Sequence, residues 1–562
     1  MTLITSKVIV MSKMNRREFL KATAIGTSGL ISGLMSGCAV MEGFKMGGRG
    51  RPNVLFIICD DLNDSIAGMG GHPQAKTPNI NRLMRKGVRF VNAQCNDPLC
   101  APSRASMLSG LYPHTTGYLE FYHWRKNAVL GDCVSLMEHF RNEGYGVYCT
   151  GKLFHNQHED YENYTEYGYE ANFGPFPWDG VDRTPADWQE GKAVTDNWKE
   201  HPQMQFIFKG HESIRTHWEQ TFGALSNVPD WPADPEKGIP GYKGWRLYNR
   251  PFRYVSADDR DLVPDELYAQ YATEVLQREH DKPLFLGVGF CRPHTPLYAP
   301  KEYFDMFPLE SIQLPPYKAD DLEDCAEALK KFQPYGFERY QLMIDAGGEE
   351  MWKRWIQAYL ACVAFVDDQV GKVLAALEKS PYAKNTIVIV TSDHGFHMGE
   401  KDYLFKDSAW EESCRIPLVV YAPGVSQPGT ECEHPVSLID LYPTLIDLCG
   451  LDKNPNAGTN GYPLDGYSIR PFLHDPYRGR WRGPAVALSM IGGWGRALNF
   501  SVRSRDWRYV LCENGEEELY DHRKDPHEWT NLAQDTRFTD VKNSLRNHLI
   551  QSAEPNNAKS TR

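Results

Sequence analysis

Three continuous apolar runs divide the chain, and each predicts a strand buried on both faces. The runs cover residues 53–59, 283–290 and 386–390, and a shorter one covers 147–150. Each is too short for a typical helix and is rich in β-branched or aromatic residues. Strands without polar alternation are typical of mostly parallel sheets that helices cover on both sides, so the pattern predicts an α/β fold.

Amphipathic stretches between these runs predict the covering helices. One helix is expected from Thr77 to about Gly87, a longer one within Trp352–Leu377, and another beginning around Ser103. After a Pro/Gly-rich crossing near 456–465, the pattern changes to short runs that indicate antiparallel strands. These runs begin after about residue 485 and include 500–503, 507–511 and 518–521. The last part of the chain is therefore expected to contain antiparallel strands.

Composition limits the function classes. The chain has 562 residues, 41% of them hydrophobic and 12% aromatic, which excludes a disordered or fibrous protein. Its net charge of −12, with no basic block, argues against nucleic-acid binding. An anionic substrate would therefore need a local cluster of cations. The thirteen cysteines include no CxxC pair, so neither a disulfide framework nor a zinc ribbon is indicated.

The N-terminus predicts export. Residues 15–21 (NRREFLK) resemble a twin-arginine signal, and a small-residue apolar stretch, too short for a membrane span, follows at 22–34. The sequence then reads Met35-Ser36-Gly37-Cys38, which resembles a bacterial lipobox. We expect the twin-arginine export machinery as a partner and a periplasmic or cell-surface location, with a lipid anchor on Cys38. The alternative is an ordinary signal peptide cut nearby.

Polar residues follow the predicted strands at the point where each ends. Asp60 and Asp61 follow the first run, and Asp393 and His394 follow the third. Ligands bind beyond the carboxyl ends of strands in open α/β sheets, so these side chains are expected to meet. Adjacent carboxylates repel each other unless a cation joins them, and a hard divalent metal is the natural partner. The alternative, a solvated Asp-Asp turn, is disfavoured by the position after a buried strand.

The segment Cys100-Ala101-Pro102-Ser103-Arg104 resembles the one that a maturation enzyme reads in type I sulfatases, where the cysteine is oxidised to Cα-formylglycine. The alternative for a single cysteine is a buried structural residue. Other segments extend the resemblance. Gly151-Lys152-Leu153-Phe154-His155 matches the second signature of this family, and the family motifs follow in order from about Asn53 to Leu532.

The resemblance implies an alkaline-phosphatase-like fold, with a mixed, mostly parallel sheet flanked by helices and a smaller C-terminal α+β subdomain. The expected divisions are a signal peptide at 1–38, a linker at 39–51, a catalytic domain at 52–480, a C-terminal subdomain at 481–552 and a disordered tail at 553–562.

The resemblance also assigns roles. A calcium ion would be held by five side chains, namely those of Asp60, Asp61, Asp393, His394 and the hydrated residue derived from Cys100. Nitrogen is an unusual ligand for calcium, so His394 has the alternatives of contacting sulfate or lying at the edge of the shell. One hydroxyl of the formylglycine hydrate would attack sulfur, and the other would later collapse to the aldehyde and expel sulfate.

The resemblance assigns charge stabilisation, sulfate binding and proton transfer to the remaining site residues. Arg104 and Lys152 would stabilise the hydrate, and Lys152 and Lys406 would bind sulfate oxygens, with Lys401 as a rival of Lys406. His294, with Lys406, would protonate the departing alcohol, and His155 would remove a proton as sulfate leaves.

Within sulfatases the chain looks closest to iduronate 2-sulfatases and their bacterial relatives. The evidence is Tyr122-His123-Trp124-Arg125, Arg292-Pro293-His294 and His394. The expected function is hydrolysis of sulfate monoesters on a sulfated carbohydrate, with specificity in the irregular stretch 156–282. Four residues there could clamp a sugar or be structural: Trp245, Arg246, Tyr248 and Arg250. Two other functions remain open, a phosphonate or phosphate monoester hydrolase and a non-catalytic glycan-binding lipoprotein.

Overall fold

The computed structural model describes residues 50–156, 159–178, 180, 221–233, 235, 236, 238, 240–247 and 250–553. The predicted signal peptide with Cys38, most of the predicted linker, Tyr248 and all but the first residue of the predicted tail lie outside the described residues. No described helix is both long enough and apolar enough to cross a membrane.

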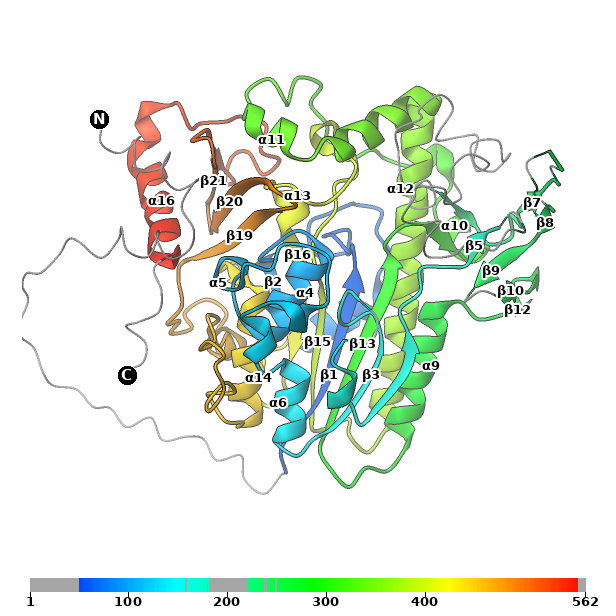
Figure 1. The fold of residues 1–562 in the computed structure, drawn as a ribbon, viewed down its shortest axis with the longest axis horizontal. Helices are drawn as coiled ribbons and strands as arrows, with labels where there is room; N and C mark the ends of the chain where they lie inside the picture. Colours follow the sequence, from blue (N-terminus) through cyan, green and yellow to red (C-terminus); the bar gives the residue numbers. More distant parts are fainter. Residues whose placement is uncertain are drawn as a thin grey trace, which may run out of the picture.

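A nine-stranded mixed sheet forms the centre of the molecule, and β1 (Asn53–Asp60) lies inside it between two parallel neighbours (Figure 1). The strand order is β17 (Thr430–Cys432), β2 (Val88–Gln94), β16 (Arg415–Tyr421), β15 (Thr386–Ser392), β1, β13 (Leu284–Pro293), β3 (Gly146–Gly151) and β4 (Glu166–Glu170), with β18 (Val436–Ser437) beside β2. Only β16 runs antiparallel to its neighbours, β15 and β2. The predicted α/β fold with a mostly parallel sheet is confirmed.

Alternate side chains of β1 enter two separate cores, which explains its continuous apolar sequence. Leu55, Ile57 and Cys59 pack on one face, while Val54, Phe56 and Ile58 pack on the other. The first face is covered by α3 (Pro78–Met84), α9 (Pro264–Gln277) and α12 (Pro334–Lys379). The second face is covered by α4 (Cys100–Ser109), α6 (Leu136–Asn142) and α14 (Leu441–Cys449). Each large apolar side chain buried in this way contributes about 1.5–3 kcal/mol.

A second sheet of four antiparallel strands follows the main domain. Its strands are β19 (Val486–Gly493), β20 (Arg496–Ser504), β21 (Trp507–Cys512) and β22 (Glu517–Asp521), and α16 (Thr539–Ala553) packs against it. Strand β19 lies beside the segment that precedes α4: the Asn96 side chain donates to the Leu488 carbonyl at 2.8 Å. The C-terminal unit is thereby fixed next to the start of α4.

Candidate active site

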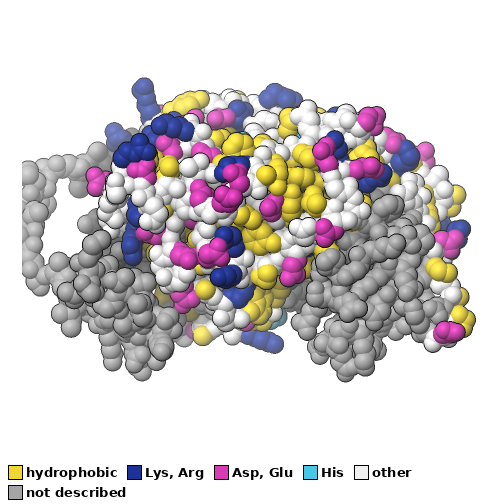
Figure 2. Space-filling view, turned by 90° about the horizontal axis from the view of Figure 1, so that it is seen from above, with side chains coloured by type: hydrophobic (Ala, Val, Ile, Leu, Met, Phe, Trp, Pro, Cys, Tyr) yellow, Lys and Arg dark blue, Asp and Glu magenta, His cyan; other side chains and the backbone are white. Residues whose placement is uncertain are grey.

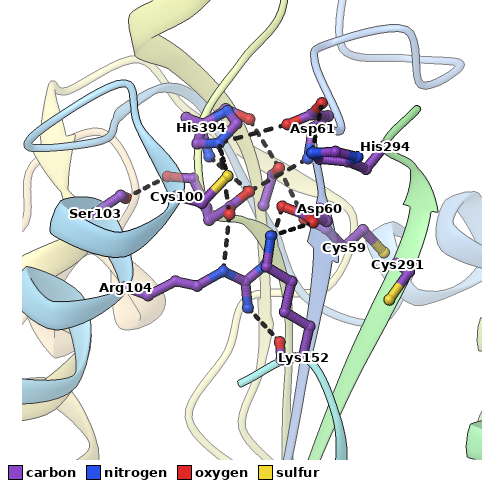
Figure 3. A network of polar contacts seen from close by, with 12 residues as sticks. Cys59, Asp60, Asp61, Cys100, Ser103, Arg104, Lys152, Cys291, His294 and His394 are labelled. Carbon is purple, nitrogen blue, oxygen red and sulfur yellow. Dashed lines mark hydrogen bonds and ion pairs between the residues drawn. The ribbon is translucent and has the colours of Figure 1, made fainter. Parts of the chain in front are cut away.

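The carboxyl ends of the parallel strands bring the predicted site residues together. Asp60 ends β1, Asp393 and His394 follow β15, Lys152 follows β3, and His294 follows β13. The arrowheads of these strands point toward the top of Figure 1, and Figure 3 shows the side chains converging around Cys100. Asp60, Asp393 and His394 are fully buried.

Local backbone geometry turns the two aspartates into different directions. The β1–β13 register shifts between Cys59 and Asp60, and Asp61 has a left-handed φ of 62°. Two contacts hold that conformation: the Asp61 N–H donates to Asp393 Oδ1 at 3.3 Å, and the Tyr359 hydroxyl donates to the Asp61 carbonyl at 2.7 Å. Left-handed backbone at a non-glycine residue is costly and persists where surrounding contacts fix it.

Cys100 is the first residue of α4, three residues earlier than the predicted helix start. Its Sγ lies 3.1 Å from His394 Nε2 and 3.2 Å from Lys406 Nζ. Burial alone would raise the pKa of the Cys100 thiol, but the nearby Lys152 and Lys406 ammonium groups lower it well below its usual value. The positive end of the helix dipole acts in the same direction. The position therefore favours a negative charge.

Arg104 lies one turn further along α4 and holds the two acidic ends of β1 and β15 together. Its Nε donates to Asp393 Oδ2 at 2.8 Å and its Nη2 contacts Asp60 Oδ1 at 3.3 Å. Its Nη1 donates to the carbonyls of Lys152 and Leu153. Arg104 is expected from the sequence to stabilise the hydrate at residue 100; in the structure its guanidinium contacts the carboxylates and the backbone.

Two lysines neutralise the remaining carboxylate oxygens. Lys152 Nζ lies 2.5 Å from Asp60 Oδ2, and Lys406 Nζ lies 2.5 Å from Asp61 Oδ1. Burial would raise the pKa of the Asp60 carboxyl, yet the Lys152 ammonium holds it far below its usual range. Conversely, burial would lower the pKa of Lys406, but Asp61 and Cys100 raise it.

The rival lysine points elsewhere. Lys401 has a left-handed φ of 55°, and its Nζ donates to Asp321 Oδ1 at 2.9 Å and to the Glu528 carbonyl at 2.6 Å. The part of the chain that the structure describes thus brings Lys406, rather than Lys401, to Cys100.

Three histidines lie near Cys100, and the groups that each one contacts are different. For His394, burial opposes the charged form, but the Asp393 carboxylate outweighs it and raises the pKa to about 9. His155 is half-buried, and burial lowers its pKa even though it interacts with Cys100. His294 Nδ1 lies 2.5 Å from the Thr295 carbonyl, which can only accept, so this nitrogen carries the proton and Nε2 faces Asp61 Oδ2 at 3.8 Å.

Four of the predicted ligands form a geometrically compact set. One ligand atom from each of Asp60, Asp61, Cys100 and His394 lies within 4.8 Å of the others. Asp393 lies beside this set, where its Oδ1 accepts the backbone N–H groups of Asp61 and His394. The two carboxylates fit the oxygen preference of a hard divalent cation, and a hydroxyl at residue 100 would add a third oxygen.

Several supporting residues carried no signal in the sequence. Ser392 Oγ donates toward the Cys59 and His394 carbonyls, and Asp265 on α9 accepts the N–H groups of Cys291 and Arg292. Phe173 covers His294 with ring centroids 4.4 Å apart. These residues come from segments far from the motifs, so only the fold reveals their role.

The residues proposed to clamp a sugar in the stretch 156–282 have different positions in the structure. Trp245 is 1% exposed and its indole donates to the Leu225 carbonyl, so this residue is structural. The Arg246 guanidinium stacks on Trp178 at 4.0 Å. Arg250 is exposed and lines a cavity of about 470 Å³ together with Glu170, Asp261 and their neighbours.

Comparison with known proteins decides the family. A family model described as sulfatase matches residues 52–451, and a model described as the C-terminal region of N-sulphoglucosamine sulphohydrolase matches residues 399–555. The chain belongs to the sulfatase family. Sulfatases are sulfuric ester hydrolases, so the family resemblance and the enzyme class predicted from the sequence are confirmed.

Relatives match along nearly the whole chain. A sulfatase of Formosa agariphila is 34% identical, over 87% of this chain and 84% of the relative. The iduronate 2-sulfatase of Mus musculus is 29% identical, over 85% of this chain and 88% of its own.

Solved structures share the fold at lower identity. A protein in complex with its substrate D-glucosamine-2-N,6-O-disulfate aligns with a TM-score of 0.63 at 18% identity, covering 91% of this chain and all of the other. The phosphonate monoester hydrolase of Agrobacterium radiobacter aligns with a TM-score of 0.61 at 21% identity, covering 89% and 95% of the two chains. The alkaline-phosphatase-like sulfatase fold predicted from the sequence is confirmed.

Proposed function

We propose that this sulfatase removes sulfate from a sulfated carbohydrate, with Cys100 converted to Cα-formylglycine as its reactive residue. One observation carries the proposal: the Cys100 side chain lies at a helix start, 3.2 Å from the Lys406 ammonium and 3.1 Å from His394. A thiol at this place can attack only once. After conversion, residue 100 would supply two hydroxyls on one carbon, one to attack sulfur and one whose collapse releases sulfate.

The charges around residue 100 suit a sulfate monoester. Lys152 and Lys406 are buried cations beside Cys100, and they provide the local positive field that a chain of net charge −12 lacks overall. Fixed cations in a water-poor site stabilise developing negative charge strongly. We assign sulfate binding to these two lysines, while Arg104 keeps Asp60 and Asp393 in position.

Two histidines suit the proton transfers. His155 has a lowered pKa through burial, so it is neutral near pH 7 and can accept a proton from the hydroxyl of residue 100. We assign protonation of the departing sugar oxygen to His294, with Lys406. His294 lies near Asp61 and under Phe173, on another strand end than His155.

We propose Ca²⁺ as the metal, held by Asp60, Asp61, the hydrated residue 100 and His394, with Asp393 beside them. When bound, it would supply positive charge for the reacting oxygens. Lys152 and Lys406 pair with the two aspartates, so these carboxylates keep a cationic partner when the metal is removed. Chelation should abolish turnover, because the positive charge on the reacting oxygens is lost, and added Ca²⁺ should restore it. The melting temperature should change little, because the lysines still pair with the aspartates.

A phosphonate or phosphate monoester hydrolase is the second candidate, favoured by the fold shared with phosphonate monoester hydrolases. Side-by-side kinetics on an aryl sulfate, an aryl phosphonate and a panel of sulfated monosaccharides separate the two. The proposal expects the largest kcat/KM on a sulfated sugar. A larger value on the phosphonate would overturn it, and glycan binding without any turnover would favour the non-catalytic lipoprotein.

We also propose export through the twin-arginine pathway after modification of Cys100, with a lipid on Cys38. That pathway carries folded proteins, which suits a residue that must be modified inside the cell. Replacing Arg16 and Arg17 by lysine should leave the protein in the cytoplasmic fraction. Replacing Cys38 by alanine should release it from membranes, and unchanged fractions in both variants would contradict the assignment.

A further inference from the structure

Two exposed aromatic side chains from distant parts of the sequence lie in a row against His155. The Phe121 ring stacks on the His155 imidazole with centroids 4.2 Å apart at 24°, and the Trp494 ring meets Phe121 edge-on at 5.2 Å. Phe121 is 44% exposed and Trp494 is 49% exposed. The row therefore runs from a residue beside Cys100 out to solvent. We call Phe121 and Trp494 the rim pair.

Trp494 occupies a backbone position that does not suit tryptophan. Trp494 and Gly495 form the two-residue turn between β19 and β20, with φ values of 51° and 71°. Positive φ at both central residues defines a type I′ turn, for which Asn-Gly is the preferred sequence. A bulky residue there is unusual, so folding alone does not explain the tryptophan.

The turn is also fixed toward the main domain. The backbone N–H of Trp494 donates to Glu120 Oε1 at 2.7 Å, and Glu120 is the residue before Phe121 in the sequence. Gly493 packs so closely on the Leu119 carbonyl that an added Cβ would lie 2.2 Å from its oxygen. The C-terminal subdomain thus places a rigid aromatic ring at a set position beside the candidate active site.

The charges near the rim pair select between possible ligands. The Arg496 guanidinium lies 5.1 Å from the Trp494 ring and pairs with Asp407, the residue after Lys406. A cation beside the ring disfavours a quaternary ammonium group, which would otherwise suit exposed aromatics. A neutral ring that carries a sulfate fits this environment. Figure 2, which views the molecule from above Figure 1, shows hydrophobic side chains gathered near the middle of that face.

We propose that the rim pair is the surface on which the pyranose ring of the substrate stacks while its sulfate lies at residue 100. The inference rests on the proposed carbohydrate sulfatase function and names the residues that select its substrate. The C–H face of a sugar is apolar, and a rigid aromatic ring offers it contact area at a small cost in conformational entropy. Trp494 makes no contact with the reacting groups, so it acts on binding.

The test is the variant Trp494→Asn, measured on the sulfated monosaccharide that the wild type hydrolyses fastest and on an acyclic alkyl sulfate. The variant removes the ring but gives the turn its preferred Asn-Gly sequence. We expect KM for the sugar to rise about tenfold, equivalent to about 1.4 kcal/mol, with kcat within about twofold. The increase should be several times larger for the sugar than for the acyclic ester. The melting temperature should stay equal or rise.

Two further variants serve as matched controls. Trp494→Phe keeps an aromatic ring and should recover most of the affinity. Tyr477→Asn removes a tyrosine that is 77% exposed, in the segment after α15 (Arg470–His474), and should leave KM unchanged. An unchanged sugar KM in Trp494→Asn, or a fall in melting temperature as its only effect, would overturn the stacking surface alone. A wild type that hydrolyses aryl sulfate but no sulfated sugar would overturn both this inference and the proposed substrate class.

Discussion

Two buried charge clusters in this protein look alike as groups of residues and differ in how their charges are paired. The active-site cluster contains Asp60, Asp61, Cys100 and His394, and the second contains Glu411, His522 and Glu528 at the contact with the C-terminal subdomain. Both sets place their ligand atoms within 4.8 Å of one another, as a metal site requires. Distance between ligands therefore does not separate a reactive site from a structural one.

In the second cluster, arginine and histidine side chains pair with both carboxylates. Arg508 contacts both Glu411 and Glu528, Arg503 Nε lies 3.0 Å from Glu411 Oε2, and His522 Nε2 lies 2.9 Å from Glu528 Oε1. A guanidinium holds a carboxylate with several fixed hydrogen bonds. Lysine, in contrast, is a compact charge on a flexible stem, and Lys152 and Lys406 each supply one ammonium at the active site. The arginine cluster is suited to joining domains, and the lysine cluster is suited to receiving an anion.

The largest effect is expected from Cys100→Ala. The change removes the residue that we propose to react but leaves the surrounding ion pairs, so kcat should fall by about 10⁴-fold or more. The melting temperature should change by only a few degrees. Sulfate release and calorimetry on the same preparation measure both quantities, and retained turnover would sink the formylglycine role.

The arginines of the two clusters give a matched pair. Arg508→Met leaves Glu411 and Glu528 short of a buried cation and should cost about 3–5 kcal/mol of unfolding free energy, with near-normal kcat per folded molecule. Arg104→Met should lose both stability and activity, because Asp60 and Asp393 shape the active site. Equal losses of activity in the two variants would refute the distinction.

The cost of Arg508→Met should also depend on pH. Burial alone would raise the pKa of Glu528, but the Arg508 guanidinium lowers it to about 2. The pKa in the folded state is depressed, so the stabilisation is complete above about pH 4.5 and is lost as the pH falls toward 2. Denaturant unfolding at several pH values should show the two proteins converging in acid.

Lys406→Met should reduce kcat by about 10²–10³-fold, the usual loss for one group that stabilises transition-state charge. Lys401→Met is the control, since that lysine contacts Asp321 and the Glu528 carbonyl. It should lower the melting temperature and spare kcat. The reverse pattern would reassign the sulfate-binding lysine.

The smallest effect concerns pH and His155. Burial lowers the pKa of His155 below its ordinary value of 6.5, so the imidazole stays neutral and able to accept a proton in mildly acidic solution. The acid limb of the kcat profile should lie below pH 6.5. In Phe121→Leu the His155 imidazole should be more hydrated, and the acid limb of the kcat profile should move toward pH 6.5. A limb already above 6.5 in the wild type would remove His155 from the proton-accepting role.

The sheet, and the side chains that gather at its carboxyl edge, could be predicted from the sequence. Buried parallel strands have continuous apolar sequences, as in β1, and residues that follow them meet at one edge. The resemblance favoured Lys406 but left Lys401 as a rival, because the left-handed backbone at Lys401 has no local sequence signal. Nor could the sequence show that Arg104 holds carboxylates, that Trp245 is buried, or that Trp494 reaches Phe121 across 373 positions. These facts depend on tertiary contacts without local sequence signals.

The formylglycine at position 100 is tested most simply by the mass of the tryptic peptide Phe90–Arg104, from protein purified from its native host and alkylated. The peptide contains Cys95 and Cys100, so Cys95 serves as an internal control. We expect one alkylated cysteine and a loss of about 18 Da at residue 100, the change from thiol to aldehyde. Two alkylated cysteines in protein that still releases sulfate would contradict the central claim that formylglycine at position 100 is the reactive group.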